Sequence, residues 1–309
     1  MSIDLSWMKT ESRLLLDVPL KPVQGTRFQP TGFPDLGAAS YRVPGSGEAV
    51  LVESAQSMAN RLEATIWDSA KRELISAAQG IPYIVTTAPG HETSSIEESH
   101  RLNSGYFPDS LRKSVGDKIQ YSRTSPVNVV AFARELLRLD PNCILHGVFL
   151  SQLEDGRLRL PRLLSSFVEA KDAALVASGG VKLDRISAKG EAEKGTGHIP
   201  FSRTEYSAAE ITAFFNLDLH LLRSYGLPEE ANRFLVILAL YKIRAVLESG
   251  LRFRTACDLE VDESKTQGAI RARRPKDWSL PGLEDLAQEL AATVAGCKAH
   301  FADPAVTRV

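Results

Sequence analysis

The sequence predicts an α+β fold, on three observations. The longest elements follow one another in the order strand, helix, strand, strand, helix, strand along a chain of 309 residues. A helix that starts at Pro228 is apolar on nearly every side through Leu247, which indicates the most buried helix of the fold. The segment that follows alternates apolar and polar residues from 251 to 260, which is the period of a strand with one buried face. This order of elements is that of the ferredoxin-like folds, among which RNA-recognition domains are found.

The first third of the chain is predicted as a strand, a long loop and a helix. The run 14–20 is short, apolar and stopped by prolines, as in a strand. Residues 24–47 contain five glycines and three prolines and show no regular period, which indicates a long loop of the kind that usually carries function. Apolar residues then recur at three- and four-residue steps over 51–68, which predicts an amphipathic helix.

The rest of the chain supplies further elements and two unusual segments. We expect a strand at 81–87, a helix from 125 to about 139, a hairpin of strands 144–152 and 157–160, a helix opened by the capping box Ser207-x-x-Glu210 and ending near Gly226, and a last helix at about 283–297. Residues 178–206 are glycine-rich and charged, which indicates a protruding insertion. Residues 264–276 hold five basic residues and no acid.

We expect one domain over residues 1–309, interrupted by insertions. The insertions lie at about 24–50, 88–124 and 178–206, and a basic segment and a helix follow at 264–309. Such insertions account for the length of the chain, which on its own permits one domain or two.

The composition excludes several classes of protein. With 37 basic and 38 acidic residues the formal net charge is −1, so any binding to nucleic acid must depend on local patches. Cys143, Cys257 and Cys297 stand far apart, which excludes a disulfide framework and favours a reducing compartment. The N-terminus has no apolar signal segment, and the longest apolar run, 234–240, is far shorter than the roughly 20 residues of a membrane helix. We therefore expect a cytoplasmic protein that contacts no membrane.

No enzymatic motif survives a check of its spacing. Gly190 and Gly195 have the Walker A separation, but Thr196 stands where the lysine must follow. The dinucleotide-binding glycine pattern is incomplete, and no two of the six histidines stand at helical ligand spacing. We expect no cofactor and no metal, and we interpret His146 and His220 as structural histidines.

Nucleic-acid binding fits the sequence better than catalysis. Cations near flexible glycines, with aromatic rings at hand, suit a single-stranded backbone and its splayed bases. Such groups occur in the first loop, with Arg27, Phe28 and Phe33, in the insertion 178–206 and in the basic segment 264–276. The alternative that these are solvated surface charges stays open.

Two long sequence words resemble a known family. The words GTRFQPTGFPDLGAA, from Gly25 to Ala39, and LVESAQSMANRLE, from Leu51 to Glu63, resemble the backbone subunit of the type I-U CRISPR effector complex, also called the type I-G Cascade. This family belongs to the RAMP superfamily. The segments 203–207, 215–219 and 223–227 extend the resemblance, which spans about residues 14–261.

The resemblance implies a modified RNA-recognition fold with a thumb-like insertion and a non-catalytic role in antiviral defence. Subunits of this family polymerise along CRISPR RNA into a helical spine and leave the bases of the guide free to pair with target DNA. The implied partners are CRISPR RNA, target DNA, other copies of the chain, a large subunit, a guide-processing subunit and a recruited helicase-nuclease. As the thumb we favour the insertion around Gly179 to Arg203 over the stretch from His91 to Arg123.

The candidate site residues follow from the matched segments and from side-chain polarity. We expect RNA contacts from the first loop, the helix behind it, the insertion at 178–206 and the strand at 251–260. These contacts are Arg27, Phe28, Gln29, Thr31, Phe33, Gln56, Ser57, Asn60, Arg61, Lys182, Arg185, Lys189, Arg203, Arg252 and Arg254. The candidates for contact with target DNA are Arg271, Arg273 and Arg274.

The alternative function is that of a metal-dependent ribonuclease acting on guide-bound target RNA. Related spine subunits of type III complexes cut target RNA with a loop aspartate, and Asp35 lies in the first loop. A magnesium site needs a second acid nearby, and the next one along the chain is Glu48. We therefore expect Asp35 to cap a turn or to contact a neighbouring subunit.

Overall fold

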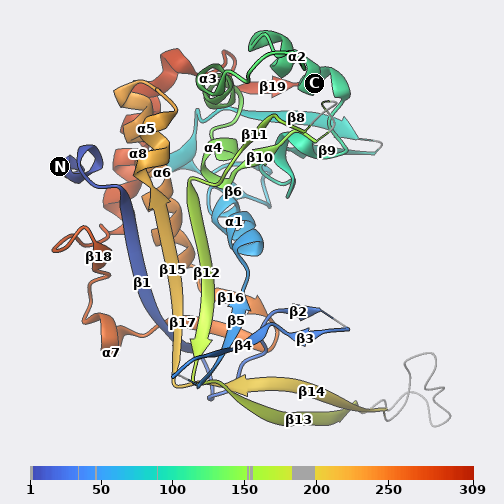
Figure 1. The fold of residues 1–309 in the computed structure, drawn as a ribbon, viewed down its shortest axis with the longest axis vertical. Helices are drawn as coiled ribbons and strands as arrows, with labels where there is room; N and C mark the ends of the chain where they lie inside the picture. The colour runs from blue at the N-terminus through green and yellow to red at the C-terminus, as the bar shows by residue number, and fades with distance from the viewer. Residues whose placement is uncertain are drawn as a thin grey trace.

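An antiparallel sheet forms the centre of the protein (Figure 1). The computed structural model describes residues 3–33, 35–45, 47–88, 90–151, 153, 156–182 and 199–309. The strands of the sheet lie in the order β16 (Leu251–Arg254), β17 (Cys257–Val261), β1 (Arg13–Pro22), β15 (Glu210–Asp218), β12 (Leu164–Lys171), β5 (Gly47–Glu53) and β4 (Ser40–Val43), and β18 (Ala272–Arg274) pairs with β1.

The sheet has a ferredoxin-like topology, but the strands expected at 81–87 and 144–152 lie outside it. Two helices, α1 (Ala55–Ala64) and α6 (Glu229–Glu248), alternate with four of its strands in the chain order β1, α1, β12, β15, α6, β17. In space these four strands lie in the order β17, β1, β15, β12, so the first and the third strand are central. This is the ferredoxin-like arrangement of RNA-recognition domains, and the predicted α+β fold class is confirmed.

Alternating burial explains why the central strands form. Along β1 and β15 every second side chain is buried. These buried side chains are Leu14, Leu16, Val18 and Leu20 of β1 and Ile211, Ala213, Phe215 and Leu217 of β15. Helix α6 lies behind these strands in Figure 1 and is buried along most of its length, as predicted, because α8 (Leu283–Cys297) packs along it. The side chains between these buried ones point to the opposite face of the sheet and are only half-buried.

The predicted helix at 51–68 is wrong at its N-terminal end. Residues up to Glu53 belong to β5, where Val50 and Val52 are buried and Leu51 is half-buried, the alternation of a strand. Helix α1 begins only after Ser54, whose hydroxyl oxygen accepts a hydrogen bond from the amide of Ser57 at 3.2 Å. The short apolar run before this cap fits both periods, so its spacing alone does not separate strand from helix.

The predicted helix at 207–226 is wrong over most of its length. Residues 210–218 form the central strand β15, and only α5 (Leu219–Ser224) is helical. Two adjacent phenylalanines and two adjacent β-branched residues suit a strand paired on both sides, and this pairing overrides the capping pattern. The neighbouring strand β12, at 164–171, has no counterpart among the expected elements.

Two expected stretches are broken by turns. The strand expected at 251–260 is the hairpin β16–β17, which reverses at residues 255–256. The first loop is not irregular throughout, because β2 (Gly32–Phe33) pairs with β3 (Gly37–Ala38) and β4 pairs with β5. These pairings turn residues 32–53 into two consecutive hairpins.

Smaller elements surround the sheet. The helices are α2 (Asp109–Lys118), α3 (Val129–Leu139), α4 (Asn142–His146) and α7 (Glu263–Thr266), with 3-10 turns η1 (Ser6–Lys9), η2 (Ser76–Ala78), η3 (Arg101–Asn103) and η5 (Lys298–His300). The strands are β6 (Trp67–Asp68), β7 (Glu73–Leu74), β8 (Tyr83–Ala88), β9 (His91–Ser94), β10 (Val148–Phe149), β11 (Arg159–Leu160) and β19 (Val306–Arg308). Helix α3 starts after the cap Asn128, later than expected, and α4 replaces the first residues of the strand expected at 144–152. Among the described residues no helix is long and apolar enough to cross a membrane.

Strands β13 (Ala174–Lys182) and β14 (Ile199–Ser207) form a long hairpin that projects from one end of the molecule (Figure 1). They directly extend β12 and β15, because only residues 172–173 and 208–209 separate the paired strands. The hairpin therefore continues the central ribbon of the sheet. Residues 183–198, between its two strands, lie outside the described residues.

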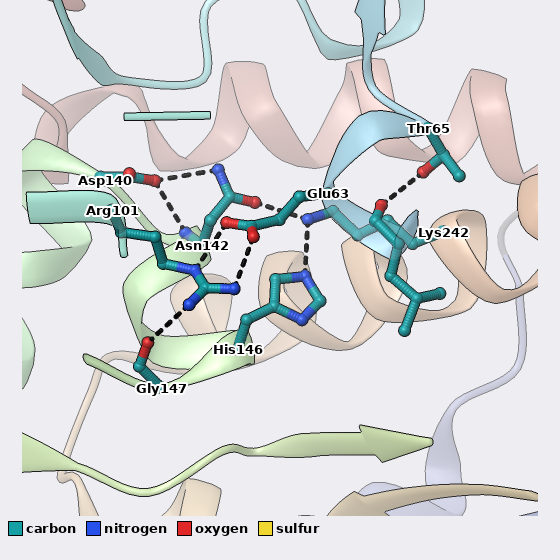
Figure 2. A network of polar contacts seen from close by, with 9 residues as sticks. Glu63, Thr65, Arg101, Asp140, Asn142, His146, Gly147 and Lys242 are labelled. Carbon is teal, nitrogen blue, oxygen red and sulfur yellow. Dashed lines mark hydrogen bonds and ion pairs between the residues drawn. The ribbon is translucent and has the colours of Figure 1, made fainter. Parts of the chain in front are cut away.

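A buried polar network joins the helices behind the sheet (Figure 2). Glu63 of α1 pairs with Arg101 of η3, with 2.7 Å between Oε1 and Nε. Lys242 of α6 donates to Oδ1 of Asn142 at 2.5 Å, and its Nζ lies 2.9 Å from Nε2 of His146. The network therefore ties α1 and α6 to the segment around η3 and α4.

Burial dominates the ionisation of this network. It raises the pKa of Glu63 to about 7, against the attraction of the Arg101 guanidinium, and it lowers the pKa of Lys242 to about 7. Burial also holds the pKa of His146 well below its ordinary value, so this imidazole is neutral and structural, as predicted. His220 is exposed, and its interpretation as a structural histidine is wrong.

Replacing Lys242 by methionine is expected to remove a pH dependence of stability. Because burial lowers the pKa of Lys242 from its ordinary 10.5 to about 7, the unfolded chain binds a proton between these values that the folded protein does not. The wild-type protein therefore gains stability as the pH rises through this window, by at most about 1.4 kcal/mol per pH unit. Urea denaturation at about pH 7.5 and about pH 9.5 measures the gain in both proteins. Equal gains in the wild type and in Lys242→Met would contradict the prediction.

Candidate nucleic-acid interface

The first loop is anchored to strands β14 and β5 and to the turn between β16 and β17. Phe28 exchanges two backbone hydrogen bonds with Tyr206 of β14, at 2.9 and 2.8 Å. The amide of Gln29 donates to Ala256 O at 2.7 Å, and the amide of Thr31 donates to Val52 O at 3.0 Å. The side chain of Phe28 is fully buried, so the expectation that its ring stacks on a base is corrected. Its backbone pairing with β14 is what carries this ring into the core.

Arg254 holds the same loop from the side of β16. Its Nη1 donates to Gln29 O at 2.8 Å and to Val52 O at 3.1 Å, and its Nη2 pairs with the buried carboxylate of Glu53. These contacts use at least three of the five N–H donors of the guanidinium. The structure therefore gives Arg254 a positioning role, and the expected direct contact with RNA stays a prediction.

Arg61 of α1 is committed in a similar way. Its Nη2 donates to Phe253 O at 2.9 Å, its guanidinium lies 5.0 Å from the centre of the Phe253 ring, and its Nε lies 3.7 Å from Oε1 of Glu53. The Glu53 carboxylate is thus shared between Arg61 and Arg254. This shared carboxylate ties α1 to the strands that carry the first loop.

Arg27 and Arg203 come together at the base of the β13–β14 hairpin. Both pair with Glu205, at 3.2 Å and 3.5 Å. The two guanidiniums thus share one carboxylate. This carboxylate lines a groove of about 410 Å³, together with residues 23–27, Thr255, Ala256 and Asp258. Two predicted contacts that are far apart in the sequence are therefore neighbours in the fold.

The other predicted RNA contacts do not gather at this groove. Gln56 is exposed, Ser57 donates its amide to the cap Ser54, and Asn60 lines a separate cavity of about 220 Å³ beside Trp67. Phe33 is exposed at the tip of the β2–β3 hairpin, and Arg252 is exposed on β16. Lys182 ends β13, whereas Arg185 and Lys189 lie outside the described residues.

An aromatic pair that was not predicted from the sequence lies on the open face of the sheet. The rings of Phe167 on β12 and Phe214 on β15 stack with their centres 5.1 Å apart and their planes at 27°. On the same face of β12, Glu169 accepts a hydrogen bond from Oη of Tyr41 at 2.5 Å; burial, and then this carboxylate, raise the pKa of Tyr41 to about 12. The two-residue alternation of 164–171 and 210–218 is the signal that would reveal the pair.

Comparison with known proteins gives a family. Residues 14–175, more than half of the chain, match the family of CRISPR-associated protein GSU0053. The chain belongs to this family. The match includes the first loop and α1, which carry the two sequence words, and it confirms the resemblance to the backbone subunit of a type I CRISPR effector.

Solved structures show a partial likeness to this GSU0053-family protein. A chain of "CRISPR RNA-guided surveillance complex, pre-nicking" is 15% identical, with 76% of this chain and 68% of that chain covered and a TM-score of 0.40. Csc2 of Thermofilum pendens is 11% identical, with 96% of this chain and 80% of that chain covered and a TM-score of 0.32. No curated protein matches the chain.

The basic segment of the GSU0053-family protein folds back on the first strand. Arg273 Nε lies 3.2 Å from Oδ2 of Asp17, and Arg274 Nε lies 2.6 Å from Oε2 of Glu11. Arg271 is exposed next to a cavity of about 250 Å³ that Asp17 also lines. Two of the three candidate contacts for target DNA therefore have acidic partners within the chain.

The triple variant Arg271→Ala, Arg273→Ala, Arg274→Ala is expected to lose salt-dependent affinity for DNA and little stability. Exposed ion pairs contribute about 0–1 kcal/mol each, so the fold survives their removal. If these guanidiniums contact phosphates, the slope of log affinity against log salt falls by about 0.9 for each lost contact with duplex DNA. Filter binding of target DNA to the guide-bound complex over a salt series measures this slope, and an unchanged slope would exclude the role.

The described residues hold no group of three or more His, Cys, Asp or Glu side chains that could bind a metal ion. Asp35 is exposed on the β2–β3 turn, and its carboxylate makes no ion pair or hydrogen bond with another of the described residues. Among the described residues, Asp35 therefore belongs to no cluster of three such ligands that could hold the magnesium of the ribonuclease alternative.

Proposed function

We propose that this GSU0053-family protein binds CRISPR RNA as a spine subunit, polymerises along the guide and presents its bases to target DNA. The observation that carries the proposal is the family match over residues 14–175. These residues include most of β1 and all of α1 and β12, which are two strands and a helix of the RNA-recognition topology. A spine subunit needs to grip the backbone of a guide without reading it, because pairing with the target supplies the specificity.

In this proposal Arg27 and Arg203 bind guide phosphates at the base of the β13–β14 hairpin, which serves as the thumb. Their partner Glu205 holds both guanidiniums in place until a phosphate competes for them. We also propose that the chain forms a single domain with insertions, that it works in the cytoplasm and that it assembles with several partners. These partners are target DNA, a large subunit, a guide-processing subunit and a recruited helicase-nuclease.

The test is to express the chain alone and with a CRISPR array and its neighbouring subunits, and then to size the product and sequence the bound RNA. We expect a large assembly that carries RNA of uniform guide length. The pair Arg27→Ala and Arg203→Ala is expected to lower RNA affinity about tenfold or more, whereas Arg308→Ala, in an exposed pair with Glu92, serves as the matched control. A monomer that carries no RNA under both conditions would refute the proposal.

The ribonuclease alternative has its own test. Guide-bound complex is incubated with labelled target RNA and Mg²⁺, with Asp35→Asn as the comparison. If the protein is a non-catalytic spine subunit, we expect the target RNA to stay intact. Cuts at regular spacing that disappear in Asp35→Asn would replace the non-catalytic role by the ribonuclease.

A further inference from the structure

The groove beside Arg27 carries more negative than positive charge. Among the described residues that line it, one cation, Arg27, stands against two carboxylates, those of Glu205 and Asp258. The other polar side chains of the lining are neutral, and they are Gln24, Thr26 and Thr255. A phosphate inside the groove would meet both carboxylates, which repel it. The groove is therefore suited to a neutral group that donates hydrogen bonds.

The carboxylate of Glu205 is fixed in place beside this groove. Its Oε2 lies 3.2 Å from Nη1 of Arg27 and its Oε1 lies 3.5 Å from Nη1 of Arg203, so that each oxygen faces one guanidinium. Glu205 is only 7% exposed. The next residue, Tyr206, exchanges two backbone hydrogen bonds with Phe28, which ties β14 to the first loop. The carboxylate is thus positioned before a ligand arrives.

The chemistry of Glu205 requires a hydrogen-bond donor on the ligand. An ionised carboxylate accepts hydrogen bonds and donates none. When a phosphate draws Arg27 or Arg203 toward itself, the buried carboxylate loses part of its pairing. A buried acceptor that is left without a partner costs free energy. A strand bound at this place therefore needs to supply a donor to Glu205 in return.

In RNA the donor that lies next to the phosphates is the ribose 2′-hydroxyl. The phosphate oxygens only accept hydrogen bonds, whereas the 2′-hydroxyl both donates and accepts, and DNA lacks it. Base edges also donate, but they differ from one nucleotide to the next and are left free to pair with the target in the proposed function. Acidic side chains bind this hydroxyl in dinucleotide-binding folds. The sugar is therefore the part of a guide that best matches Glu205.

We propose that Glu205 accepts a hydrogen bond from the 2′-hydroxyl of a guide nucleotide whose phosphate is bound by Arg27 and Arg203. Glu205 is then the residue by which the chain distinguishes an RNA guide from DNA of the same sequence. The two guanidiniums supply affinity for the backbone of either strand. The inference rests on the proposed function, because it requires a nucleic-acid backbone at the base of the β13–β14 hairpin.

The measurement is the ratio of the dissociation constants of the full-length chain for DNA and for RNA. The ligands are a short single-stranded RNA that holds one copy and the deoxy strand of the same sequence with uracil in place of thymine, so that only the 2′-hydroxyls differ. The wild type should bind RNA about tenfold or more tightly, the effect of one hydrogen bond to a charged group. RNA with 2′-fluoro sugars, which keep an RNA-like conformation but donate no hydrogen bond, should bind as weakly as the DNA.

Variants assign the preference to one side chain. Glu205→Ala should bring the ratio to about 1, because the acceptor for the 2′-hydroxyl is gone. Since Glu205 is buried, the similarly shaped Glu205→Gln is a second variant, and its neutral acceptor should give an intermediate ratio. Arg27→Ala should weaken the binding of both strands and keep the preference for RNA.

Two controls remove other carboxylates. Asp258→Asn changes the second acid of the groove, and Glu92→Ala removes a carboxylate from an exposed pair with Arg308. Neither should change the ratio. Circular dichroism checks that each variant folds. A displaced first loop would weaken the binding of both strands alike, so the ratio reports recognition of the sugar and not a structural role of Glu205.

The outcomes distinguish the two proposals. If the wild-type chain binds neither strand, the proposed function fails and the inference fails with it. Equal affinity of the wild type for RNA and DNA, or tight binding of the 2′-fluoro RNA, would refute the role of Glu205 while RNA binding stands. A preference for RNA that persists undiminished in Glu205→Gln and Glu205→Ala, or that disappears in Asp258→Asn, would assign the recognition to another residue and also overturn the inference.

Discussion

Replacing Arg101 by methionine is expected to lower the free energy of unfolding by about 3–5 kcal/mol, because the change leaves a buried carboxylate without its cation. Arg101 forms two hydrogen bonds to Glu63 and a third to Gly147 O at 3.2 Å. Methionine preserves much of the side-chain volume, so the loss reports charge and hydrogen bonding more than packing. Urea denaturation at neutral pH measures it.

The control for Arg101→Met is Arg308→Met. Arg308 pairs with Glu92 at the surface, where an ion pair contributes about 0–1 kcal/mol. A second variant, Glu63→Leu with Arg101→Met, removes both charges and should recover part of the loss, because an apolar pair carries no desolvation penalty. Arg101→Met with a loss no greater than that of Arg308→Met would show that the Glu63–Arg101 pair is not a stabilising part of the core.

Replacing Arg254 by methionine is the second change with a large expected effect, on both stability and RNA binding. It removes the hydrogen bonds to Gln29 O and Val52 O and leaves the buried Glu53 with only the more distant Arg61. We expect a loss of about 2–4 kcal/mol. Since the first loop is then held less tightly, the affinity for single-stranded RNA should fall, although Arg254 need not contact the RNA.

Arg252→Met is the matched control for the stability measurement, because Arg252 stands two residues away on the same strand and its side chain is exposed without a partner among the described residues. Its effect on stability should be within about 0.5 kcal/mol. Arg254→Lys retains the charge but not the fork that reaches two carbonyls, so it should restore stability only in part. If Arg254→Met unfolds no more easily than Arg252→Met, the loop does not depend on this guanidinium.

Burial patterns explain which parts of the fold could be predicted from sequence. The helix at 229–248 is long and apolar on nearly every side, so no other element competes with that interpretation. Residues 210–218 could not be assigned by local signals, because a capping box precedes them and their partners, β1 and β12, are distant in sequence. The missed strand at 164–171 carries Ser and Glu at positions that resemble a loop, and only pairing on both sides makes it central.

The candidate site was predictable as a region and less so residue by residue. The first loop, α1 and β16 do lie together, as the RNA-binding interpretation requires. Polarity alone does not show that Arg61 and Arg254 turn to backbone carbonyls and to Glu53, since those partners are set by the tertiary fold. Phe28 was expected to be exposed because its sequence neighbours are polar. Its ring is buried, because the backbone pairing of Phe28 with Tyr206 places it in the core.

The continuity of β12–β15 with β13–β14 has a consequence for how this family can vary. The two strands of the projection leave the sheet and return to it side by side, at residues 172–173 and 208–209. Adding or removing equal numbers of residues in both strands would change the reach of the projection without shifting the register of the core. The length of the projection is thus an independent variable, which selection or an engineer can adjust while the domain that carries it keeps its structure.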